Sequence, residues 1–217
     1  MPIQNMLFRL PICLVAGLIA AALAVAQDLS LYGGTALQYH TKNDDGPKKI
    51  DLNGYLELEY KGLYGGVWAE LTDWDDYTEV DLYLGYRGEA GQFSYDVNYY
   101  YYIYTETPSD DDYGELGASV GYALTDVFSL GAEAYHQPES GDNSAYLTAS
   151  LAATDRLSLD VSWGRYQTAG DWANEWEVGV GYALGDETAV ELRYYDGQDY
   201  DDYLRLQLTW DTTILTR

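Results

Sequence analysis

The sequence has a single cysteine, Cys13, and only two histidines, His40 and His136. Cys13 lies in an N-terminal segment that we expect to be removed from the mature protein. The remaining chain would then have no thiol to form a disulfide, to bind a metal through sulfur or to act as a nucleophile. Because two histidines are also a poor donor set for a transition metal, we expect no cofactor.

Basic residues are also scarce, with 11 Lys and Arg against 36 Asp and Glu and a formal net charge of −25. This charge argues against nucleic-acid binding and against docking on anionic lipid headgroups. So acidic a chain could be disordered, but disordered segments are poor in aromatic residues. The 24 Tyr and 6 Trp, together with 22 Gly and only 5 Pro, favour a folded β-sheet protein.

Long apolar runs are missing after Ala26, so the sequence offers no candidate for a transmembrane helix there. Before it, a short head ending in Arg9 precedes an apolar run that closes on Ala24-Val25-Ala26, an A-x-A-like cleavage site. We therefore expect residues 1–26 to be a cleaved signal peptide and residues 27–217 to form one exported domain. No cysteine follows the cleavage site, so a lipid anchor is not expected.

The exported part alternates apolar and polar residues with a period of two, as in 80–87, where Val, Leu, Leu and Tyr share one face. A helix would scatter these apolar residues around its circumference, so helix is excluded for such segments. Most segments have the length of about ten residues that a tilted strand needs to cross a bilayer. The pattern predicts about twelve strands, near 28–40, 50–61, 63–72, 79–88, 92–104, 114–123, 127–136, 144–153, 156–166, 175–184, 187–196 and 202–211.

The predicted connections alternate between short turns and longer acidic loops. This alternation, an even number of strands, and Tyr and Trp at strand ends are typical of an up-and-down antiparallel transmembrane β-barrel of the bacterial outer membrane. A soluble β-sandwich is the alternative, but it has no reason to sort its loops by length. The short turns are expected at 61–62, 88–91, 125–126, 154–155 and 185–186, and the longer loops at 41–49, 73–78, 105–113, 137–143, 167–174 and 197–201.

Four stretches of the chain resemble the TorF family of porins. They are Gly62-Leu63-Tyr64-Gly65-Gly66-Val67-Trp68, Glu79-Val80-Asp81-Leu82-Tyr83-Leu84-Gly85-Tyr86, Gln92-Phe93-Ser94-Tyr95-Asp96-Val97 and Trp176-Glu177-Val178-Gly179-Val180-Gly181-Tyr182. The similarity covers about residues 50–211. It implies a secreted outer-membrane barrel with a pore role and no catalytic residues. Outer-membrane barrels often end on an aromatic residue, whereas here seven residues follow Trp210.

If the apolar residues face lipid, the residues that alternate with them face the lumen, where acids outnumber arginines. A low-dielectric wall focuses such charge, which predicts a small pore that prefers cations and passes small solutes by diffusion. The expected partners are outer-membrane lipid, the outer-membrane assembly machinery, and small solutes or cations. The pore-lining candidates are Glu57, Glu59, Glu70, Asp81, Arg87, Asp96, Asn98, Glu133, Asp160, Glu177, Glu191, Arg193 and Arg205.

A closed barrel with a structural or adhesin-like role is the alternative, because the arginines could pair with the acids and fill the lumen. A barrel of twelve strands lies between the filled barrels of eight strands and the open channels of sixteen, so strand number leaves both interpretations open. The glycines on the inner face favour free volume, although glycine also occurs where strands bend. They are Gly85, Gly117, Gly121, Gly131, Gly179 and Gly181.

Two further hypotheses have weaker support. Clustered acids in the outer loops could share a calcium ion, but none has EF-hand spacing. Ser144 could approach His136 across a loop, but no local motif supports a catalytic dyad, and we expect no enzyme activity. The acidic clusters are Asp73, Asp75 and Asp76; Asp110, Asp111 and Asp112; and Asp199, Asp201 and Asp202.

Overall fold

A computed structural model describes residues 28–41, 49–72, 78–105 and 112–217. The expected signal peptide, 1–26, lies outside this part of the chain. Within the described residues, no helix is long and apolar enough to cross a membrane. The strands are β1 (Leu29–His40), β2 (Lys49–Tyr60), β3 (Leu63–Thr72), β4 (Thr78–Ala90), β5 (Phe93–Tyr104), β6 (Tyr113–Ala123), β7 (Phe128–His136), β8 (Asn143–Ala152), β9 (Leu157–Thr168), β10 (Asp171–Ala183), β11 (Thr188–Gly197) and β12 (Tyr203–Thr216).

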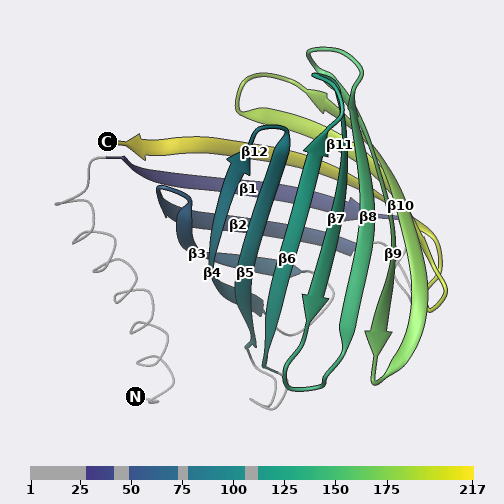
Figure 1. The fold of residues 1–217 in the computed structure, drawn as a ribbon. Helices are drawn as coiled ribbons and strands as arrows, with labels where there is room; N and C mark the ends of the chain where they lie inside the picture. The colour runs from purple at the N-terminus through teal and green to yellow at the C-terminus, as the bar shows by residue number, and fades with distance from the viewer. Residues whose placement is uncertain (1–27, 42–48, 73–77, 106–111) are drawn as a thin grey trace, which may run out of the picture.

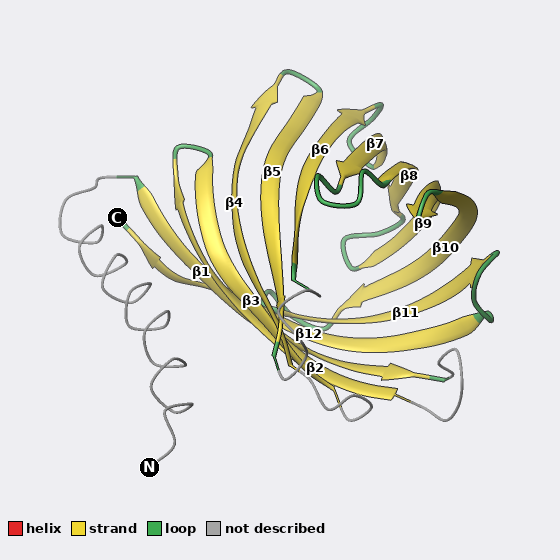
Figure 2. Cartoon of the chain, turned by 90° about the horizontal axis from the view of Figure 1, so that it is seen from below, coloured by secondary structure: helices red, strands yellow, loops and turns green. Residues whose placement is uncertain are grey.

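The strands form one closed antiparallel barrel (Figures 1 and 2). Each strand pairs with its neighbours in sequence, and β1 closes the ring by pairing with β12 from Ser30↔Thr216 to His40↔Arg205. Closure leaves no unpaired sheet edge, which a spanning structure needs because lipid cannot satisfy backbone N–H and C=O groups. The predicted all-β, twelve-stranded up-and-down barrel is confirmed.

Apolar side chains point away from the barrel interior. Leu63, Leu84, Val97 and Leu147 are each more than half exposed, at 57, 58, 58 and 60 %. Between such residues lie buried polar ones, for example Asp81, which is only 5 % exposed. This arrangement is inside out for a protein in water and is the one expected for strands that face lipid on one side.

The strands run alternately up and down, so the connections that follow β1, β3, β5, β7, β9 and β11 lie at one end of the barrel. We call this the loop end and the opposite end the turn end. At the loop end, the connection between β9 and β10 is not the long loop that the sequence predicts. Residues 167–174 are mostly strand, and β9 and β10 are joined by the two-residue turn Ala169-Gly170. Both residues have positive φ, 52° and 89°, as in the two-residue turns whose twist matches paired strands. The Asp142 carboxylate accepts both backbone N–H groups of the turn, at 3.0 and 2.9 Å, and so holds it in place. The predicted strict alternation of short and long connections is therefore wrong at this position.

The C-terminal residues after Trp210 belong to the barrel. β12 continues to Thr216, five residues beyond the predicted end at 211, and stays paired with β1 across an irregularity between Leu31 and Tyr32. Ile214 is 51 % exposed on the outer surface. The residues that follow the last tryptophan thus extend the seam that closes the barrel.

Candidate functional site on the inner face of the barrel

The thirteen pore-lining candidates lie on the face opposite the exposed apolar side chains. On β4, for example, Asp81 and Arg87 alternate with the exposed Leu82, Leu84 and Tyr86. The structure brings most of the candidates together in small groups, and these groups satisfy their carboxylates in two different ways.

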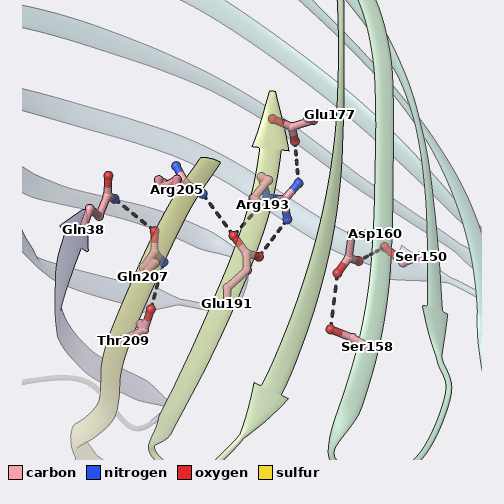
Figure 3. Close-up of polar contacts among 10 residues, drawn as sticks. All are labelled: Gln38, Ser150, Ser158, Asp160, Glu177, Glu191, Arg193, Arg205, Gln207 and Thr209. Carbon is pink, nitrogen blue, oxygen red and sulfur yellow. Dashed lines mark hydrogen bonds and ion pairs between the residues drawn. The ribbon is translucent and has the colours of Figure 1, made fainter. Parts of the chain in front are cut away.

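Arginine satisfies two carboxylates, Glu177 and Glu191, on the wall formed by β10, β11 and β12 (Figure 3). Arg193 donates to Glu177 at 2.6 Å and to Glu191 at 2.8 Å, and Arg205 donates to Glu191 at 3.1 Å. Two guanidinium groups and two carboxylates make this group electrically balanced. Such charge-assisted hydrogen bonds are among the stronger polar contacts in proteins.

A second arginine group lies across β2 and β4. Arg87 donates to both Glu57 and Glu59, and its guanidinium lies 4.4 Å from the centre of the Tyr64 ring. Glu57 is 9 % exposed, so the arginine supplies a counter-charge to a carboxylate that is largely removed from water. Two carboxylates meet one guanidinium here, so the group keeps one uncompensated negative charge.

Neutral hydroxyl groups satisfy three of the other predicted acids, Asp96, Glu133 and Asp160. The Tyr64 phenol donates to both oxygens of Asp96 at 2.8 Å. Tyr135 donates to Glu133 at 2.7 Å, and serines donate to Asp160, the shorter bond being 2.6 Å. A hydroxyl group carries no charge, so these hydrogen bonds hold the carboxylates in place and leave their negative charge intact.

A glycine allows Tyr64 to reach Asp96 across an intervening strand. Tyr64 on β3 is paired with Gly85 on β4, and the acceptor Asp96 lies on β5. A Cβ built at Gly85 would fall 2.5 Å from Cζ of the Tyr64 ring, which no real contact allows. The space expected at this inner glycine is therefore filled by a neighbouring side chain and does not add to the lumen.

The same arrangement occurs at two other places in the barrel. Each has a tyrosine, a glycine and an acid in register on three successive strands, with the phenol donating to the acid at 3.0 or 2.7 Å. The two sets are Tyr55, Gly34 and Asp211 on β2, β1 and β12, and Tyr146, Gly164 and Glu175 on β8, β9 and β10.

The remaining candidates lie on β3, β4 and β5. Glu70 is 3.6 Å from the ammonium group of Lys49, and Asn98 donates to Asp96 at 2.8 Å. Asp81 is paired with Trp68 on one side and Tyr102 on the other, and its Oδ1 has no hydrogen-bond partner in the part of the chain that the structure describes.

Several inner acids were missed in the sequence analysis. Glu175 and Asp211 lie at the predicted ends of their strands, where the alternation was not followed to the last residue. Both could have been found by counting in steps of two, Glu175 from Glu177 and Asp211 from Arg205. The missed acids of the inner face are Asp51, Glu79, Glu115, Glu175 and Asp211.

The alternative sites gain nothing from the structure. His136 contacts Asn143 at 3.0 Å, and Ser144 is paired with Tyr135, so His136 and Ser144 point to opposite faces of the sheet. No group of three or more metal-ligating side chains is arranged to hold an ion within the described ranges. Of the proposed calcium clusters, Asp73, Asp75, Asp76, Asp110 and Asp111 lie outside the described residues.

The fold is similar to that of several solved outer-membrane porins and channels. No family model matches the sequence, and no curated protein matches it. The KdgM porin is 7 % identical with a TM-score of 0.67 over 82 % of this chain and 98 % of that one. The NanC porin is 9 % identical with a TM-score of 0.61, over 84 % of this chain and 100 % of that one. An outer membrane channel from Pseudomonas putida F1 is 13 % identical with a TM-score of 0.53, over 87 % and 97 % of the two chains. At such low identities the likeness concerns the fold, and this fold is that of bacterial outer-membrane porins.

Proposed function

We propose that this protein is a porin-like channel of the bacterial outer membrane that passes small solutes by passive diffusion and prefers cations. The observation that carries the proposal is the set of inner carboxylates that are hydrogen-bonded by neutral hydroxyl groups. Hydroxyl donors bring no positive charge to offset these acids, and the low-dielectric wall focuses their negative charge into the lumen. They are Asp96, Glu115, Glu133, Asp160, Glu175 and Asp211.

The polar side-chain contacts extend only a short way around the barrel wall, and this favours an open lumen over a filled one. Each of the contacts described above between inner side chains lies within one strand or joins strands that are adjacent or separated by a single strand, so these groups lie along the wall and do not bridge the barrel. A cavity of about 620 Å³ lies along this wall at the turn end, where Arg87, Asp96 and Ser119 contribute to its lining.

The negative charge of the inner wall distinguishes the solutes proposed for this protein from the ligand found with one structural neighbour. A structure of the KdgM porin contains disordered oligogalacturonate, which is a polyanion. Polyanions would be repelled by an inner face on which acids outnumber basic side chains. The shared fold thus supports a channel, whereas the side chains of this chain favour cations over acidic sugars.

Other parts of the proposal rest on the sequence. They are cleavage after Ala26, delivery through the outer-membrane assembly machinery, contact of the outer surface with lipid, and membership of the TorF family. The exposed apolar side chains on the strands are those expected of a lipid-facing surface.

Planar-bilayer conductance of the refolded mature chain under a salt gradient tests the function. We expect discrete current steps with a cation-selective reversal potential. The double variant Asp96→Asn and Asp160→Asn should lower the ratio of cation to anion permeability by about twofold. The control variant Asp126→Asn and Asp155→Asn removes two acids from turns outside the strands and should leave the ratio close to that of the unmodified chain.

A folded, heat-modifiable barrel that gives no current steps would rule out the channel and leave the closed structural or adhesin-like barrel. Current steps with the same selectivity in the Asp96 and Asp160 double variant would mean that the inner acids do not set the preference.

A further inference from the structure

Two cavities of about 290 and 270 Å³ adjoin each other at the loop end of the inner wall, and both are lined by Tyr146 and Glu175. The first extends toward Tyr135 and Tyr166, and the second toward Tyr200. We call the two cavities together the tyrosine groove. Their combined size suits a small organic solute.

The tyrosine groove carries negative charge without a basic side chain in its lining. Among the described residues that line the two cavities there is no Lys or Arg, but there are four acids. Asp142 is held by the backbone of the Ala169-Gly170 turn, and Glu177 is paired with Arg193. The other two, Glu115 and Glu175, accept hydrogen bonds from tyrosine phenols, which bring no positive charge.

Glu175 is the acid at the centre of the groove. The Tyr146 phenol donates to one of its oxygens at 2.7 Å, and the Tyr200 phenol donates to the other at 3.0 Å. An ionised carboxylate has about four acceptor sites, so two remain for a ligand. Burial and the nearby Glu175 raise the pKa of Tyr200 above its usual range, which keeps this phenol protonated and donating.

Aromatic rings flank this carboxylate. Tyr146 crosses Gly164 to reach Glu175, and its ring meets Tyr135 edge to face at 6.2 Å. Tyr200 comes from the connection between β11 and β12, and its ring lies 6.0 Å from that of Tyr203. A carboxylate between tyrosine rings, with no fixed cation in the lining, is the environment that stabilises an organic cation.

We propose that the tyrosine groove binds small organic ammonium compounds as they enter the barrel. This inference rests on the proposed function, because it names the solute class of that channel. The rings attract the positive charge spread over the alkyl groups, and Glu175 attracts the ammonium itself. An uncharged sugar would gain only the ring contacts, and an anion would be repelled by the acids.

Isothermal titration of the full mature barrel, refolded in detergent, tests the groove without depending on conduction. Choline is the probe, 3,3-dimethylbutan-1-ol is its uncharged analogue of the same shape, and maltose is a neutral sugar. We expect choline to bind with a Kd on the order of 1 mM and the uncharged analogue to bind about tenfold more weakly. Equal binding of the analogue, tighter binding of maltose, or no binding of choline would overturn the proposal.

Substitutions test whether choline binds in the tyrosine groove. Glu175→Gln should weaken choline binding about tenfold, whereas Tyr146→Phe, which keeps the ring, should weaken it only about twofold. Asp186→Asn removes an acid from the turn between β10 and β11, at the other end of the barrel, and should bind choline as the unmodified chain does. Heat-modifiability checks that each variant is folded, and unchanged binding in Glu175→Gln would contradict the proposal.

The titration and the bilayer measurement fail independently. Cation-selective current steps without choline binding would refute the groove and leave the channel intact. Choline binding by a barrel that gives no current would support the groove as a binding site and refute the channel.

Discussion

Two parts of the inner wall satisfy buried carboxylates by opposite means. On β10 to β12, Arg193 and Arg205 pair with Glu177 and Glu191, and the charges cancel. At other inner acids, including Glu175 and Asp211 on these same strands, tyrosine phenols are the donors and bring no positive charge. Both arrangements meet the hydrogen-bonding needs of the carboxylate. The choice of donor therefore decides whether a part of the inner wall contributes negative charge to the lumen.

The two arrangements should also differ in what their loss costs. Removing an arginine leaves charged acids in a partly buried site without their counter-charge, which is strongly destabilising. Removing a phenolic hydroxyl costs about the value of one hydrogen bond, roughly 1 kcal/mol.

Arg193→Gln should lower the free energy of unfolding by about 3 kcal/mol, because Glu177 loses its partner and Glu191 keeps only Arg205. Guanidinium unfolding of the refolded barrel measures this loss. The variant should also conduct cations more selectively, since it removes a positive charge from the wall. Arg165→Gln is the control, because Arg165 lies over the ring of Trp172, which is 47 % exposed on the outer surface. An equal loss in both variants would contradict the role of the arginine group.

Gly164→Ala tests whether the tyrosine arrangement needs its glycine. The added Cβ would meet the ring of Tyr146, so the phenol must move away from Glu175. We expect a loss of about 2 kcal/mol from this overpacking, measured by the same unfolding experiment. Gly185→Ala is the matched control, because a Cβ there has no atom within 4 Å. Similar stability of the two variants would mean that the ring does not depend on the missing side chain.

Tyr64→Phe should have the smallest effect. The variant loses one donor to Asp96, and we expect about 1 kcal/mol less stability. The reversal potential should not change, because Asp96 keeps its charge and still accepts from Asn98. A double-mutant cycle with Asp96→Asn isolates the pair. A marked change of selectivity in Tyr64→Phe would show that the phenol does more than hold the carboxylate.

The sequence was sufficient for the strands and for the face of each side chain. The period of two placed Asp81 and Arg87 opposite the exposed leucines of β4, and the same step of two would have found Glu175. The prediction from sequence failed at 167–174, where the polar residues suggested a loop and the structure has strand. A strand that extends beyond the lipid bilayer can be polar on both faces, so its composition does not distinguish it from a loop.

Which donor each acid receives was decided only by the tertiary structure. The alternation of apolar and polar residues is a local property of an extended chain. The sequence alone therefore predicts strands that together have an acidic inner face. The sets of tyrosine, glycine and acid, by contrast, join three strands, and the ends of the Tyr55 and Asp211 set are far apart in sequence. Only the register of the closed barrel brings such residues into line, because a shift of one residue between two strands would turn one member of the set to the lipid side.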